Sequence, residues 1–203
     1  MTTTQHTNDF FFHEWLDDLT LRMNSNPENA ELQQAACRSL QHCIEESPSV
    51  CDLIGDHLNE DSPKWPVHVS VLAALHIHKD DIYVFQAACT TLSYMAVNSK
   101  NLQRELMSKG AYIPIVDEMR SWPGKSDIQL PACEALRALC FNDKNFEEMI
   151  VNYEVVPILQ HTLHTCCDVD TLNECLLLFI SLLDLECVRE QCLSQVSLFS
   201  FDY

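Results

Sequence analysis

The stretch QAACTTL, residues 86–92, decides the fold because its pattern of alanine, cysteine and leucine returns along the chain. A close copy, QAACRSL, stands at residues 34–40, and shorter versions occupy residues 131–136 and 174–179. In each version the apolar residues recur at helical spacing, and small side chains allow neighbouring helices to approach closely. The cysteines of the four segments are Cys37, Cys89, Cys133 and Cys175, at steps of 52, 44 and 42 residues.

A second landmark keeps the same period. Ile113-Pro114-Ile115-Val116 recurs as Val156-Pro157-Ile158-Leu159, and the two prolines stand 43 residues apart. A period of this length in a helical sequence is typical of armadillo and HEAT repeats, whose units contain two or three helices. The chain is therefore predicted to be all-α, an armadillo (HEAT-like) α-solenoid. We expect a right-handed superhelix of about four units, with incomplete units at both ends.

Three helices can be placed within one unit. A short first helix over Asn101–Lys109 should end at Gly110, where a left-handed residue is needed. Pro114 then falls in the first turn of a second helix, which reaches about Trp122. A third helix should cover residues 126–141. In the next unit, the place of Gly110 is expected to be taken by Tyr153.

The period also divides the chain. Residues 1–9 are expected to be a disordered N-terminus, residues 10–197 the repeat domain and residues 198–203 a tail. The second unit carries an acidic insertion with prolines at residues 59–66. The predicted units span residues 10–48, 49–98, 99–142 and 143–185, followed by a partial unit at 186–197.

Composition narrows the class of partner. The 203 residues include 30 Asp and Glu against 12 Lys and Arg, a formal net charge of −18, which disfavours nucleic acid and anionic membrane surfaces. Three glycines are too few for most β folds or for glycine-rich phosphate loops. The 11 cysteines are odd in number and lie mostly in apolar runs, and the N-terminus does not read as a signal peptide. We expect a cytoplasmic protein that binds a protein or peptide.

Several short runs resemble a known family. They are Ile54-Gly55-Asp56, Pro66-Val67-His68, Val84-Phe85-Gln86-Ala87 and Leu106-Met107-Ser108-Lys109-Gly110. These runs resemble the armadillo region of leucine-rich-repeat kinases, and also the armadillo tails of serine/threonine kinase-like proteins. The resemblance implies an interaction module beside a catalytic domain. The kinase motifs themselves are missing from this sequence, so the resemblance does not imply kinase activity.

Nuclear-import adaptors and catenins, which are also armadillo proteins, hold an extended peptide with asparagines late in their third helices. The matching positions here are His42, Tyr94, Ala138 and Ser181, and none of them is asparagine. This difference argues against binding of a basic localisation signal in the manner of those proteins. Without these asparagines, the specificity of binding should come from other side chains on the concave face. From helix phase we predict that the groove contains Arg38, His42, Thr90, Tyr94, Glu134, Arg137 and Glu174.

The function predicted from these observations is a non-catalytic scaffold for protein–protein interaction, accessory to a kinase or kinase-like protein. An architectural or dimerising spacer is the alternative, so self-association stays open. A thiol- or metal-dependent enzyme is the alternative from another class, and no cofactor is expected. The weak candidates for metal ligands are His161, His164, Cys166 and Cys167, of which the histidines have helical i, i+3 spacing.

The N-terminal run Phe10-Phe11-Phe12 with Trp15 is unusually apolar. Because the ends of a solenoid must be covered, we interpret it as a cap or a seam rather than a ligand site.

Overall fold

The structure of the protein is a computed structural model that describes residues 3–56, 58 and 66–198. These residues form twelve helices and no strand, which confirms the all-α prediction. The helices are α1 (Thr3–Ser25), α2 (Ala30–Glu46), α3 (Ser49–Asp56), α4 (Val67–Ile77), α5 (Ile82–Asn98), α6 (Lys100–Ser108), α7 (Tyr112–Ser121), α8 (Ser126–Cys140), α9 (Lys144–Asn152), α10 (Val155–Thr165), α11 (Val169–Leu182) and α12 (Glu186–Leu198).

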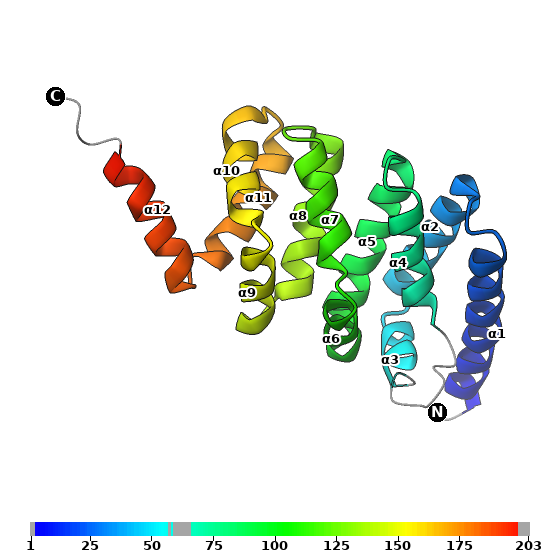
Figure 1. Cartoon of the computed structure of the whole chain (residues 1–203). Coiled ribbons are helices and arrows are strands. Elements are labelled where there is room, and N and C mark those ends of the chain that lie inside the picture. Colours follow the sequence, from blue (N-terminus) through cyan, green and yellow to red (C-terminus); the bar gives the residue numbers. More distant parts are fainter. Residues whose placement is uncertain (1–2, 57, 59–65, 199–203) are drawn as a thin grey trace.

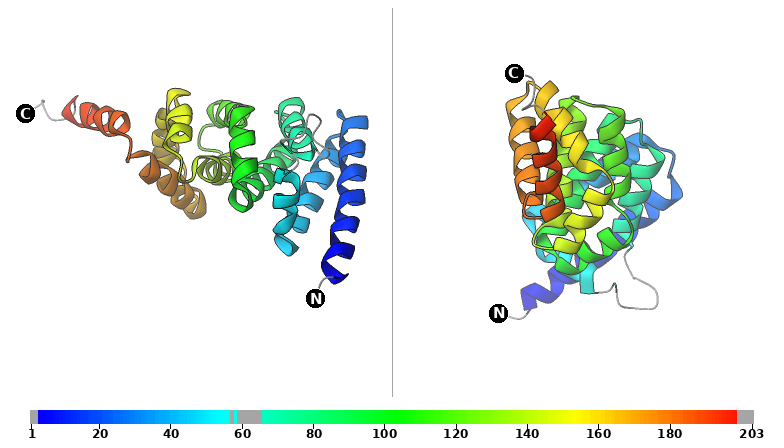
Figure 2. Two further views of the ribbon diagram at one scale, coloured as in Figure 1. Left: turned by 90° about the horizontal axis from the view of Figure 1, so that it is seen from below. Right: turned by 60° about the vertical axis from the view of Figure 1, so that its left-hand side comes forward.

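The helices follow one another along one axis, from α1 at one end to α12 at the other (Figure 1). Three groups, α3–α5, α6–α8 and α9–α11, each consist of a short helix, a second helix and a longer third helix. The pair α1 and α2 matches the second and third helices of such a group, and α12 matches the first helix of another. Two further views show the same succession, with α12 standing at the far end from α1 (Figure 2). This arrangement is an armadillo solenoid.

The third helices α2, α5, α8 and α11 pack against one another in chain order and build the core. Their starts are fixed by the N-cap residues Asn29, Asp81, Lys125 and Asp168. The Asn29 and two Asp side chains accept hydrogen bonds from backbone N–H groups of the first turn, which satisfies donors that the helix leaves free. Residues of the four helices can therefore be compared by counting from these N-caps.

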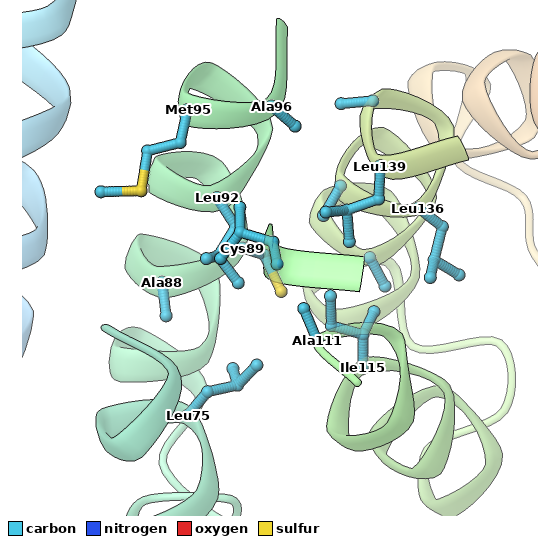
Figure 3. Close-up of a cluster of buried hydrophobic side chains, with 14 of the residues drawn as sticks. Leu75, Ala88, Cys89, Leu92, Met95, Ala96, Ala111, Ile115, Leu136 and Leu139 are labelled. Carbon is cyan, nitrogen blue, oxygen red and sulfur yellow. The ribbon is translucent and has the colours of Figure 1, made fainter. Parts of the chain in front are cut away.

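Helix α5 has two packing sides (Figure 3). Ala88 and Met95 of α5 point one way, whereas Cys89 and Leu92 point toward α8. On the first of these sides, the Thr91 hydroxyl donates to the carbonyl oxygen of Cys37 in α2 at 3.0 Å. The seventh residue after the N-cap thus faces the preceding third helix, and the eighth faces the following one.

This counting corrects one equivalence drawn from the sequence. Cys175 is the seventh residue after Asp168, so it corresponds to Ala88 and Ala132 rather than to Cys89 and Cys133. The eighth residue of α11 is Leu176. The sequence comparison matched cysteine to cysteine, whereas the helix start that Asp168 caps sets the true register.

The connections between first and second helices also differ by one residue. Gly110 has φ of 72°, as predicted, and closes α6 with a backbone hydrogen bond from Ala111 N–H to Leu106 O. In the next unit Tyr153 has φ of −89°, and the left-handed residue is Glu154, with φ of 64°. The expectation for Tyr153 was wrong because α10 follows α9 after a connection one residue shorter than that between α6 and α7.

Helix α1 begins at Thr3, before the expected domain start at residue 10, so the described part of the expected disordered segment, residues 3–9, is helical. The sequence TTQHTND has no apolar stripe that would predict this extension of the helix. Residues 59–65 of the predicted insertion and the residues of the predicted tail after 198 lie outside the described residues.

Candidate functional site

The seven predicted groove residues lie on all four third helices. Each is exposed or half-buried. Arg38, Thr90 and Glu134 are the ninth residues after their N-caps and so occupy one level of the face. His42 and Tyr94 share the thirteenth position. On α11 the corresponding face carries Leu177 and Ile180, 41% and 58% exposed, which the sequence analysis missed; it chose Glu174, the sixth residue after Asp168.

A hollow of about 310 Å³ brings three of the predicted residues together. Its lining includes Arg38, Thr90 and Glu134, with Gln86 and Pro131 between them. The Gln86 amide donates to the carbonyl oxygen of Asp127 at 3.1 Å, which ties α5 to the start of α8 beside the hollow. Polar and apolar groups line this hollow in about equal measure, and Arg38 and Glu134 offer a guanidinium and a carboxylate to a ligand.

His42 and Tyr94 meet at the carboxylate of Glu45. The Tyr94 hydroxyl donates to this carboxylate, as does the Gln41 amide at 2.9 Å, and His42 Nδ1 lies 3.8 Å from Glu45 Oε2. These donors lower the pKa of Glu45, with the Gln41 bond as the main cause. The same bond from Tyr94 raises the pKa of the phenol. Glu45, which the sequence analysis missed, holds the two predicted side chains in one network across α2 and α5.

Arg137 and Glu174 form an ion pair between α8 and α11. Arg137 Nε lies 3.0 Å from Glu174 Oε2, and the Glu174 side chain is the more buried partner. Nearby, the pKa of Glu134 is raised, chiefly by burial and then by the charge of Glu174. The structure therefore places three predicted residues in one cluster, in which Arg137 is already paired within the chain.

A larger hollow, of about 600 Å³, lies where α5 and α8 end. Val97 and Phe141, the sixteenth residues after their N-caps, expose 69% and 59% of their surface here. Ala96 and Ala138 line it as well, and Lys100 and Arg137 also contribute to the lining. The sequence analysis did not single out Val97 or Phe141; their shared helix phase is the signal that could have found them.

The weak metal candidates do not form a cluster. His161 and His164 are exposed on α10, Cys167 is exposed, and buried Cys166 lies 3.3 Å from the Ser126 hydroxyl. Within the described residues, no three His, Cys, Asp or Glu side chains come together in a way that could hold a metal ion.

The N-terminal apolar run contributes to a third hollow. Phe12 and Trp15 pack against the core from α1 and, with Ser39, His42 and Cys43 of α2, line a space of about 470 Å³. These two aromatic residues thus cover part of the outer side of α2, as a cap would. The side chains of Phe10 and Phe11 lie outside what the structure describes.

Fold and surface together define an armadillo-repeat domain, a class whose members typically bind proteins or peptides. The comparison with protein families gives the particular one: the chain matches the LRRK2 ARM repeat family over residues 3–194 and belongs to that family. No solved structure matches the chain. Among the described helices, none combines the length and apolarity that crossing a membrane requires.

Proposed function

We propose that this chain is a protein-interaction domain that binds an extended segment of a partner across α2, α5, α8 and α11. The observation that carries the proposal is the pair of hollows on neighbouring third helices, of about 310 and 600 Å³, which share Glu134 in their linings. A peptide that follows the helix row would contact both.

The character of the two hollows suggests the chemistry of the segment. Arg38 and Glu134 line the smaller hollow, whereas Val97 and Phe141 dominate the exposed apolar surface of the larger one. A bound segment would therefore place an apolar side chain between Val97 and Phe141 and polar groups toward Arg38. Burying one such apolar side chain contributes about 1.5–3 kcal/mol, enough to anchor a short peptide.

Membership in a family named for a leucine-rich-repeat kinase supports a second part of the proposal. The domain would act as an accessory to a kinase or kinase-like protein and would recruit that protein's partner or substrate.

The test is a peptide-display screen with the whole chain as bait, repeated with the double variant Tyr94→Ala/Arg137→Ala. We expect the variant to lose at least tenfold in affinity for peptides that the native chain selects. The matched control is Tyr83→Ala/Arg104→Ala, which removes the same residue types at exposed positions on α5 and α6 away from the face. Equal binding by the native chain and the Tyr94→Ala/Arg137→Ala variant would show that the groove proposal is wrong.

A further inference from the structure

We call the contact between two neighbouring third helices a seam. At each seam the eighth residue of one helix faces the seventh residue of the next, and these two residues are cysteine and alanine in all but one case. In the seam between α2 and α5, Cys37 at the eighth position stands opposite the side of α5 that carries Ala88 at the seventh. In the seam between α5 and α8, the corresponding residues are Cys89 and Ala132. In the seam between α8 and α11 they are Cys133 and Cys175. Of these three described seams, the last alone has a cysteine at both of the facing positions.

The two thiols of this seam lie close enough to influence each other. Cys133 and Cys175 are both buried, and each side chain shifts the pKa of the other. Cys175 Sγ in turn donates to the carbonyl oxygen of Leu159 at 3.4 Å, so its lone pairs are free to accept from Cys133. Helices α8 and α11 also approach closely along this row, because alanine or cysteine occupies the seventh and eighth positions at each seam.

We propose that Cys133 and Cys175 are a thiol-modification site that forms a reversible disulfide on exposure to a peroxide and so ties α11 to α8. The Arg137–Glu174 ion pair spans the same seam, with Glu174 next to Cys175 in the chain. The disulfide would therefore fix the C-terminal end of the groove face. The inference does not depend on the proposed function, because it concerns the packing of the two helices themselves.

The chemistry balances in two steps with a peroxide as oxidant. The Cys175 thiolate attacks one oxygen of hydrogen peroxide; a sulfur–oxygen bond forms, the oxygen–oxygen bond breaks, and hydroxide leaves and takes up a proton as water. The Cys133 thiol then attacks the Cys175 sulfur and gives its proton to the leaving hydroxide; the sulfur–sulfur bond forms, the sulfur–oxygen bond breaks, and a second water departs. The two sulfurs together lose two electrons, which the peroxide gains.

Electrostatics favours Cys175 as the first thiol to react. The hydrogen bond from Cys133 lowers the pKa of Cys175, whereas burial raises the pKa of Cys37, Cys51 and Cys140 to about 12. The thiolate is the reacting form, so a lowered pKa increases the reactive fraction.

Access to the buried pair comes from the position of α11 in the row of third helices. The side of α11 opposite α8 is incompletely covered, since Leu176 is 45% exposed and Leu172 and Phe179 are only partly buried. A helix packed on one side opens more readily than one packed on two, so α11 can separate transiently from α8. We expect oxidation of the pair to be slower than oxidation of exposed Cys167 and Cys187, because it waits for this opening.

The experiment treats the whole chain with hydrogen peroxide under native conditions, blocks remaining thiols and digests the chain with a protease that cleaves after glutamate. Cleavage after Glu118 and Glu134 and after Glu174 and Glu186 isolates Cys133 and Cys175 on separate peptides, each with a single cysteine. Mass spectrometry should find peptide 119–134 linked to peptide 175–186, and dithiothreitol should separate them. The oxidised chain should melt roughly 5 °C above the reduced chain, because the bond restricts the unfolded state.

Two variants keep the result interpretable. Cys175→Ala gives this seam the cysteine–alanine arrangement of the other two, so it should fold, and it should lose both the linked peptides and the rise in Tm. Ala132→Cys places a thiol opposite Cys89 and should create a second linkage, between α5 and α8. The proposal is overturned if peroxide links only exposed cysteines while Cys133 and Cys175 stay reduced, or if Cys175→Ala shows the same rise in Tm.

Discussion

Gln103 in α6 and Glu147 in α9 occupy the same position of neighbouring units, the fourth after the N-caps Ser99 and Asp143, and both are buried. The Gln103 amide donates to the carbonyl oxygens of Ala138, Leu139 and Phe141 at 2.9–3.1 Å and so satisfies the end of α8. Glu147 has no proton to donate when ionised. Its Oε2 is buried without a hydrogen-bond partner, and its pKa is raised, chiefly by burial and then by the charge of Asp184.

The difference teaches that the repeat conserves backbone geometry more strictly than polar satisfaction. Both units have the same helix order and a left-handed residue at the same point after the first helix. At these two positions the unit α6–α8 has a glutamine and a glycine, whereas the unit α9–α11 has two glutamates, Glu147 and Glu154. We infer that the second unit is the less stable of the two, which agrees with the incompletely covered side of α11.

The largest effect on stability should come from a substitution that makes the unit α6–α8 resemble the unit α9–α11. Gln103→Glu removes three hydrogen bonds from buried carbonyls and places a carboxylate among them, so unfolding should become easier by on the order of 3 kcal/mol. Urea denaturation measures the change. Asn101→Asp adds the same charge at an exposed position of α6 and should shift stability by less than about 0.5 kcal/mol. Equal effects of the two substitutions would contradict the role assigned to Gln103.

The reverse change should stabilise the second unit. Glu147→Gln supplies an amide that can donate to the end of α11, as Gln103 does for α8, and removes a buried charge; we expect a gain of about 1–2 kcal/mol at neutral pH. A raised pKa in the folded state means that the native glutamate stabilises the fold below pH 4.5, its ordinary pKa, and that this contribution is lost as pH rises through the folded pKa.

The gain from Glu147→Gln should therefore be largest at neutral pH and shrink on acidification toward pH 4.5. Denaturation curves across this range measure it. Glu148→Gln removes one charge at the neighbouring exposed position and should show little effect at any pH. A gain that does not depend on pH would mean that the charge of Glu147 is not its cause.

Most of the fold could be predicted from the sequence because it depends on local patterns. Periodic apolar residues place the helices, Gly110 marks the end of α6, and Pro114 lies in the first turn of α7. What sequence reasoning missed depends on contacts between distant residues. Gln103 meets carbonyls more than thirty residues away, and no local pattern distinguishes it from other helical glutamines.

The groove also combines features that local sequence patterns predict with features that depend on contacts between helices. Helix phase found Arg38, Thr90 and Glu134, which line one hollow. It misplaced the end of the face on α11, where residue types were aligned without the helix start. It also could not anticipate that Arg137 and Glu174 pair with each other, because the relative position of two helices decides that distance.

The smallest effect concerns the left-handed residue that both units share. A side chain at positive φ brings its Cβ close to the backbone, which costs on the order of 1 kcal/mol for a residue other than glycine. Glu154→Gly should remove this cost and raise the stability by about 0.5–1 kcal/mol, measured as a rise in the urea midpoint at unchanged slope. The opposite change, Gly110→Ala, should destabilise the first unit, because the new Cβ would also lie 2.9 Å from Ile113 Cδ1. If Glu154→Gly lowers the midpoint instead, the greater freedom of glycine in the unfolded chain outweighs the strain, and Glu154 is not a weakness of the second unit.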